Sequence, residues 1–265
     1  MAIGLGDYWK CLHRDQSVAA PSFMGRFDEF DVMDNAEYVP DDCADKWDLA
    51  IPMMLKNDLL NVLAWITGNR EGGMALVSIY PIVVDGGATD MVVEGTTAWP
   101  KNLEGLVHAR FGEMPISFFD ALFPISRERY VVGETARFSL AAFGSSLHKL
   151  SSIAEIAGKH SNLTESITKV YETGNGDLLT MPNQEGIEDR YMLTGRLKHL
   201  QHETIDEMHL MRANVSLTNG LTIPLIFGET SIETDEWTPQ EGDFIVSVIF
   251  LQGYREGLAL HSHHD

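Results

Sequence analysis

Apolar and polar residues alternate along much of residues 74–144, and an alternation of period two is typical of half-buried β-strands. In GETARFSLAAFG, residues 133–144, one face of the predicted strand carries Ala136, Phe138, Leu140 and Ala142. Glycine-containing turns separate this run from earlier ones, which are MALVSIYPIVV (74–84), TDMVVEGTTAW (89–99) and NLEGLVHARFGE (102–113). Short strands between such turns predict a small sandwich or barrel over residues 59–150.

The strand pattern returns near residue 190, after a stretch of different character. Residues 145–173 place Leu147, Leu150 and Ile153 at three-residue spacing, which predicts short amphipathic helices, and turn formers in 174–186 indicate a linker. Further strands are then expected at 191–205, 207–217, 221–229 and 243–256. The Asn219–Gly220 pair favours a tight hairpin between two of them.

Short phrases recur in the two strand-rich segments in the same order. The matched pairs are Ile66-Thr67-Gly68 with Leu193-Thr194-Gly195, Gly105-Leu106 with Gly220-Leu221, Phe111-Gly112-Glu113 with Phe227-Gly228-Glu229, and Gly133-Glu134 with Gly242-Asp243. This order predicts a duplicated barrel, with Gly68 and Gly195 supplying the bends that let a long strand coil. The alternative is two unrelated β-domains that share frequent turn chemistry.

The second segment is similar to an OB fold, a small five-stranded barrel. It offers a long strand with a glycine near its start, a hairpin, a longer crossover and a closing strand, although one strand of the five and the crossover helix are not evident. We therefore predict a mostly β protein with two tandem OB-like barrels. The expected divisions are an acidic N-terminal arm at 1–58, barrels at 59–150 and 189–258, a helical connector and linker at 151–188, and a disordered His-rich tail at 259–265.

Composition indicates an ordinary globular protein of 265 residues with 44% apolar and 22% charged residues. No apolar run reaches the ~20 residues that a membrane-spanning helix needs. The first residues lack the basic and apolar regions of a secretory signal, and two cysteines, Cys11 and Cys43, are too few for a disulfide framework. We expect a reduced, cytoplasmic protein.

The net charge of −20 predicts repulsion from nucleic acid and anionic membranes at long range. The acidity serves solubility, or it attracts a basic partner by imitating the phosphates that the partner normally binds. The charge is uneven, because residues 59–150 carry seven Lys/Arg and nine Asp/Glu, a net of −2. This segment is therefore the better candidate for single-stranded nucleic acid, through Arg110, Arg127, Arg129, Tyr130 and Arg137. The alternative is that SRERY (126–130) is a solvated loop.

A histidine-rich stretch, KHLQHETIDEMH (198–209), is the candidate metal site. His199 and His202 face opposite sides of a regular strand and would meet only at a bulge or in a helix. If TIDE forms a hairpin turn, His202 and His209 become cross-strand neighbours and would form a zinc pair with Glu203 or Glu207 as third ligand. The alternative is a set of polar residues on a solvent face.

No nucleophile motif, Walker loop or dinucleotide fingerprint occurs in the sequence, and we expect neither a cofactor nor catalysis. The favoured function is a non-catalytic binding or adaptor protein whose acidic surface engages a macromolecule, for instance a basic nucleic-acid-binding protein. Unpaired strand edges would also favour a protein partner or a second copy of the chain. The alternatives are a single-strand-binding protein and a metal-dependent hydrolase built on the His199–His209 cluster.

Overall fold

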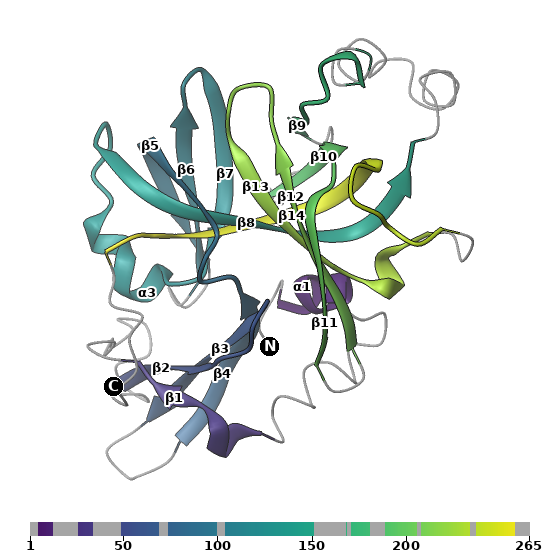
Figure 1. Cartoon of the computed structure of the whole chain (residues 1–265). Coiled ribbons are helices and arrows are strands. Elements are labelled where there is room, and N and C mark those ends of the chain that lie inside the picture. The colour runs from purple at the N-terminus through teal and green to yellow at the C-terminus, as the bar shows by residue number, and fades with distance from the viewer. Residues whose placement is uncertain are drawn as a thin grey trace.

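The computed structural model describes residues 5–12, 26–33, 49–68, 74–99, 104–150, 168, 171–180, 189–205, 208–233 and 237–257. The fold is mostly β, as the sequence predicts, and its strands belong to two sheets. Figure 1 shows the smaller sheet, β1 to β4, lying below the larger one, with helix α1 (Leu5–Leu12) between them.

The smaller sheet is antiparallel and contains β1 (Asp31–Val32), β2 (Leu49–Leu55), β3 (Asn61–Gly68) and β4 (Met74–Ile82), in that order. This corrects the expectation that strands from residue 59 onward belong to the first barrel, since β3 and β4 pair within this separate sheet. Gly68 is the last residue of β3, where it pairs with Leu49 and Met74, so it does not bend a barrel strand. A strand-length apolar pattern predicts the strand but leaves its neighbour undetermined.

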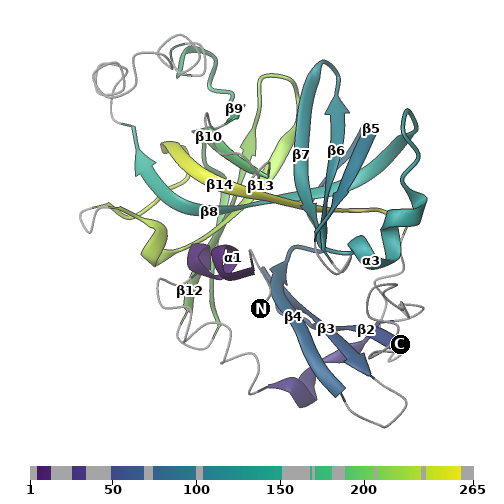
Figure 2. The ribbon, with the colours of Figure 1, turned by 180° about the vertical axis from the view of Figure 1, so that it is seen from behind.

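The larger sheet has ten strands in the order β11-β12-β13-β8-β5-β6-β7-β14-β10-β9, and an additional pairing of β8 with β14 closes it on itself. Their bounds are β5 Gly87–Ala98, β6 Gly105–Phe111, β7 Met114–Asp120, β8 Thr135–Lys149, β9 Asp177–Thr180, β10 Arg190–Arg196, β11 Lys198–Ile205, β12 Met208–Ser216, β13 Thr222–Gly228 and β14 Phe244–Arg255. Figures 1 and 2 show β8 and β14 running together across the molecule.

The first closed ring runs β5-β6-β7-β14-β8 and back to β5. Four of its strands come from the first half of the chain, and the fifth, β14, comes from the second half. β14 pairs in parallel with β7, through Gln252 and Phe119, and antiparallel with β8. A short helix, α3 (Phe123–Ser126), followed by η3 (Arg127–Arg129), lies in the crossover from β7 to β8. This is the five-stranded, OB-like order, with one strand borrowed.

The second ring is completed by β8, a strand from the first half of the chain. β10 and β11 are separated by Leu197 alone and form one bent strand, β12 and β13 follow, and β13 pairs in parallel with β8 through Ile226 and Phe143. β14 then pairs with β10 in antiparallel register. β9 pairs with the other edge of β10, and just before β9 an isolated bridge joins Gly176 to Leu217. Each barrel therefore takes its fifth strand from the other, which explains why the sequence shows one strand fewer than an OB barrel needs.

The recurring phrases mark equivalent positions only in part. Gly133 and Gly242 are equivalent, because each precedes a shared strand with a φ near 90° (87° and 89°). Gly112, by contrast, turns between β6 and β7 with φ 59°, whereas Gly228 ends β13. In the order of strand pairing, β6 corresponds to β12 and β7 corresponds to β13. The similar sequences of β6 and β13 therefore reflect common turn chemistry and not equivalent positions in the two barrels.

Gly195 lies in β10, two residues before Leu197, which separates β10 from β11. Its φ is 155°, and a Cβ there would stand 2.5 Å from Cγ1 of Val215. A side chain would therefore prevent the bent strand from approaching β12.

Two cores fill the molecule. One occupies both rings and includes the predicted face Ala136, Phe138, Leu140 and Ala142. The other lies between the smaller sheet, α1 and the outer side of the rings. In this second core the Tyr8 hydroxyl donates to Asp189 at 2.7 Å, and Trp9 Nε1 donates to the Ile79 carbonyl at 3.0 Å. The described parts of residues 1–58 are thus built into the fold rather than forming an arm.

The predicted helical connector differs from the structure where it is described. Leu147, expected on a helix, lies in β8, which continues to Lys149. Thr168 and residues 171–173 are helical, while 151–167, 169–170 and 181–188 lie outside the described residues, as does the tail from 258. Within the described part of the chain, no helix is long and apolar enough to cross a membrane.

Candidate functional site

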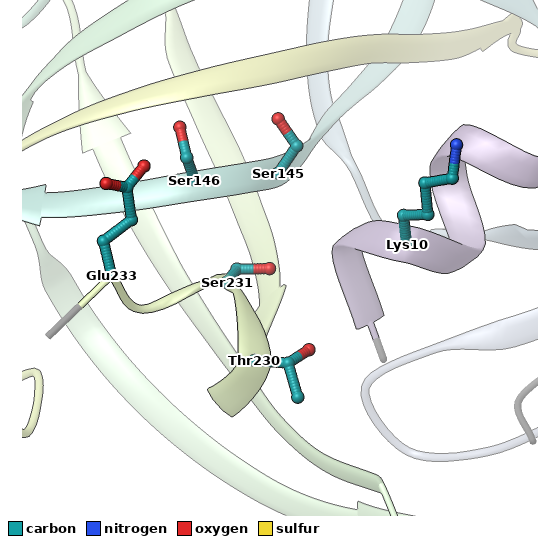
Figure 3. Close-up of a pocket in the computed structure, with 6 residues that line it drawn as sticks. All are labelled: Lys10, Ser145, Ser146, Thr230, Ser231 and Glu233. Carbon is teal, nitrogen blue, oxygen red and sulfur yellow. The ribbon is translucent and has the colours of Figure 1, made fainter. Parts of the chain in front are cut away.

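A polar pocket of about 430 Å³ opens where three elements meet. Helix α1 contributes Lys10, strand β8 contributes Ser145 and Ser146, and the 3-10 turn η4 (Glu229–Ser231) with the residues after it contributes Thr230, Ser231 and Glu233. The close-up in Figure 3 places Lys10 at one side, Glu233 at the other and the serines of β8 between them. The pocket therefore offers one cationic group, one anionic group and four hydroxyls.

Two of the four hydroxyls donate hydrogen bonds to backbone carbonyls within the protein. Ser231 Oγ donates to the Cys11 carbonyl at 2.8 Å, and Ser145 Oγ donates to the Val248 carbonyl at 3.1 Å. Because a hydroxyl has one proton and two lone pairs, these oxygens can only accept from a ligand. Thr230 Oγ1 is buried and has no hydrogen-bond partner among the described residues, so it retains both capacities.

The pocket walls are fixed by short backbone contacts. A parallel bridge joins Leu147 of β8 to Ile232, and Glu233 N donates to the Leu147 carbonyl at 3.3 Å. On the other wall, a Cβ at Gly228 would overlap the Leu12 carbonyl at the end of α1. Glycine at this position thus lets α1 close against η4, which is a local reason for the glycine in FGET.

Glu233 forms the edge of the site and is half-exposed. Its carboxylate lies 2.9 Å from His148 Nε2, a pair that is ionic when the histidine is protonated. No pattern in the sequence predicts this site, because Lys10 and Glu233 are more than two hundred positions apart and isolated serines and threonines are common on surfaces.

The residues predicted to bind nucleic acid lie on or beside the first barrel, where carboxylates accompany two of the arginines. Arg110 Nε is 2.8 Å from Glu94, and Arg137 lies 3.4 Å from Asp90 and 3.0 Å from Glu256. Arg127 and Arg129 form η3, where Arg129 is exposed. The structure brings these arginines to the same barrel, but Arg110 and Arg137 already form ion pairs with carboxylates of the protein.

Tyr130 faces inward rather than outward. Its hydroxyl donates to the buried Asp120 carboxylate at 2.6 Å, and its ring stacks on Phe138 at 6.0 Å. Burial raises the pKa of Asp120 to about 6, although bonds from Ser126, Tyr130 and the Leu122 N–H favour the charged form. Burial and the Asp120 charge raise the pKa of Tyr130 well above its ordinary value. Asp120 thus fixes the crossover, and Tyr130 does not offer a free face for stacking on a base.

The candidate metal residues lie on the β11–β12 hairpin. Thr204 pairs with His209 and His202 with Met211, so the two histidines lie on one face but in diagonal positions. The turn at TIDE was expected to place them directly opposite each other, but the observed register, with Ile205 paired to Met208, is shifted from it. Glu203 belongs to the opposite face and accepts from the N–H groups of Asp58 and Leu59, while Glu207 lies outside the described residues. A bulge does occur between Lys198 and Gln201, at His199. Among the described residues no group of three His, Cys, Asp or Glu side chains is placed to hold a metal.

Comparisons with known proteins give a single distant structural similarity to report. No family model matches the chain, and no curated protein matches its sequence. A solved structure of the cytoplasmic molybdate-binding protein ModG, with molybdate bound, is similar over 64% of this chain and 96% of that chain. The sequence identity is 11% and the TM-score is 0.34.

Proposed function

We propose that this is a non-catalytic binding protein whose acidic surface engages a basic macromolecule, such as a protein that otherwise binds nucleic acid. The observation that carries the proposal is the excess of carboxylates over cations. The chain has 39 acidic and 19 basic residues, an excess of 39 − 19 = 20. A surface with this excess attracts a cationic partner and repels a polyanion at long range.

Ion pairs among the described residues support a preference for a cationic partner over a nucleic acid. Arg212 contacts Asp85 at 2.7 Å, Arg255 contacts Glu134 at 2.9 Å and Lys149 contacts Asp243 at 2.6 Å, in addition to the pairs of Arg110 and Arg137. A cation held beside a carboxylate presents little net charge to a phosphate. Breaking one exposed pair costs only ~0–1 kcal/mol, so the remaining net charge is the larger obstacle to nucleic acid.

The test is a titration of the full chain with a fluorescent peptide rich in lysine and arginine, followed by anisotropy at low and moderate salt. We expect saturable one-to-one binding that weakens with salt, because exposed charges are screened. A glutamate-rich peptide of the same length is the control and should not bind. A variant with glutamine at four exposed positions, Glu113, Glu128, Glu229 and Glu241, should bind the basic peptide severalfold more weakly.

A labelled single-stranded oligonucleotide separates this proposal from the nucleic-acid alternative. Saturable, salt-sensitive binding of the oligonucleotide that is lost in Arg110→Gln/Arg137→Gln would overturn the acidic-surface proposal. Equal binding of basic and acidic peptides would also overturn it, because charge would then not select the partner. Self-association through a strand edge is a distinct outcome, and it would appear as a molecular mass that rises with concentration.

A further inference from the structure

The sequence contains two Asn-Gly dipeptides, Asn175–Gly176 and Asn219–Gly220, and the structure places them in different environments. An asparagine is chemically labile before glycine, because a following residue without a side chain lets its backbone nitrogen reach the asparagine amide. We propose that Asn219 is a site of spontaneous covalent modification, at which the amide becomes a carboxylate through a cyclic imide, and that the fold protects Asn175. This modification is independent of the acidic-surface proposal.

The reaction at Asn219 needs water as its only co-reactant. The backbone nitrogen of Gly220 attacks Cγ of Asn219, so an N–Cγ bond forms and the Cγ–Nδ2 bond breaks. Nδ2 leaves as ammonia, which carries away the proton of the Gly220 N–H. Water then opens the imide at either of its two carbonyls. The product at position 219 is aspartate or, with one extra main-chain methylene, isoaspartate.

The side chain of Asn219 bends back toward the nitrogen that attacks it. Its Oδ1 accepts from the N–H of Leu221 at 3.1 Å, which keeps the side-chain carbonyl group near the intervening nitrogen of Gly220. Its Nδ2 donates to Sδ of Met114 at 3.4 Å, and a thioether is only a weak acceptor. An arrangement that already brings the reacting groups together raises the rate of an intramolecular reaction.

The turn around Asn219 gives the Gly220 nitrogen room to move. Its N–H donates to the Leu217 carbonyl at 3.0 Å, a bond that must open before the nitrogen attacks. Thr218, Asn219 and Gly220 are all exposed, and a Cβ at Gly220 would meet no atom within 4 Å. Figures 1 and 2 show the β12–β13 hairpin, which ends in this turn, projecting beside the β6–β7 hairpin. Local opening of an exposed hairpin tip costs little free energy.

The backbone at Asn175–Gly176 is fixed, although the reactive groups are the same. Gly176 is buried, its N–H donates to the Ser216 carbonyl at 2.6 Å, and its carbonyl accepts from the Thr218 N–H at 2.9 Å. A Cβ at Gly176 would stand 2.3 Å from the Thr194 carbonyl oxygen, so the residue is enclosed between β10 and β12. The nitrogen could attack only after Gly176 had left this position and lost both bonds.

The experiment ages the full chain in a mildly alkaline buffer at physiological temperature, and peptide mass spectrometry follows aspartate and isoaspartate at both positions. We expect Asn219 to react at least about tenfold faster than Asn175, because its nitrogen is released by a smaller opening. In urea that unfolds the chain the two rates should converge. Equal rates in the folded protein, a faster reaction at Asn175, or an unreacted Asn219 after the unfolded chain has reacted would overturn the proposal.

Two matched variants assign the product to its position. Each new carboxylate adds one negative charge, so ageing should produce a more acidic species on anion exchange. Asn219→Gln should suppress this species, because a longer side chain must form a larger ring, whereas Asn175→Gln should leave it unchanged. Circular dichroism before ageing should show that both variants are folded. An acidic species that persists in Asn219→Gln would overturn the assignment.

The basic-peptide titration described above uses freshly prepared protein, in which Asn219 is still an amide. Its result therefore does not depend on this reaction, and failure of the modification proposal can be told apart from failure of the acidic-surface proposal.

Discussion

Gly133 and Gly242 occupy equivalent positions at the starts of the two longest shared strands. Their N–H groups donate to the carbonyls of Val93 and Leu197, each at 2.8 Å. Val93 lies within β5, and Leu197 lies at the bend between β10 and β11. The two glycines therefore define an approximate twofold relationship in which β8 corresponds to β14, and each barrel closes with a strand of the other.

The first prediction concerns the backbone of these glycines. Their φ values of 87° and 89° lie in the left-handed region, so Gly133→Ala and Gly242→Ala should each lower the free energy of unfolding by about 1–2 kcal/mol. Urea denaturation would measure the loss. Gly95→Ala is the control, because an added Cβ meets no atom within 4 Å and the φ is not positive. A comparable loss at Gly95 would show that backbone strain is not the cause.

A second prediction follows from the exchanged strands. Fragments 1–160 and 161–265 should each fail to unfold cooperatively, since β7 lacks β14 in one and β13 lacks β8 in the other. Mixing the two should restore a cooperative transition in urea, as monitored by circular dichroism. If either fragment alone unfolds cooperatively with near-native sheet content, the barrels are not mutually dependent.

The close approach of α1 and β13 gives a third prediction. Gly228→Ala would place a methyl group against the Leu12 carbonyl and should destabilise the protein by about 1–3 kcal/mol through overpacking. Displacement of α1 should also expose Cys11, which is fully buried at 0% exposure. In a Cys43→Ser background, the rate of thiol labelling would report this exposure. Gly95→Ala, where an added Cβ meets no atom within 4 Å and the φ is not positive, should leave the labelling rate unchanged.

The fourth prediction is a pH dependence of stability that arises at Glu104. This side chain is 8% exposed, and burial raises its pKa from 4.5 to about 7. The folded state thus holds the proton more tightly than the unfolded state, so the contribution to stability is complete below pH 4.5 and is lost as the pH rises through 7. The loss amounts to about 3 kcal/mol by the linkage relation, and Asp120 adds a change of the same sign as the pH rises through about 6.

The variant Glu104→Gln should remove its part of this dependence. Above pH 7 the variant should be more stable than the parent, because the buried charge is gone. Chemical denaturation at pH 5 and pH 8 would measure both effects, with Glu113→Gln as an exposed control. An unchanged difference between the two pH values in Glu104→Gln would contradict the assignment.

Local patterns in the sequence are sufficient for several features of this protein. Period-two alternation predicts the strands, and the face Ala136, Phe138, Leu140 and Ala142 is the one that enters the barrel core. The Asn219–Gly220 turn is where the sequence places it, and Asn219 Oδ1 accepts from Leu221 N at 3.1 Å. These features depend on residues that are near one another in the chain, so a local pattern is enough to predict them.

The sequence by itself determined most strands of the larger sheet, with their inner faces and turns, because each depends on a few consecutive residues. It did not predict the end of β8, where a helix was expected, or β9, which lies in the predicted linker. Only the tertiary structure decided which strands are neighbours, since alternation orients a strand toward a core without choosing its partner. β7 pairs in parallel with β14, and β13 pairs in parallel with β8. Parallel neighbours are not joined by a tight turn, so no turn motif in the sequence indicates that they pair. The separation of β3 and β4 into another sheet could not be predicted either, because the alternation in these strands does not specify their partners. The pocket could not be predicted from the sequence, because it forms only where α1, β8 and η4 meet from distant parts of the chain.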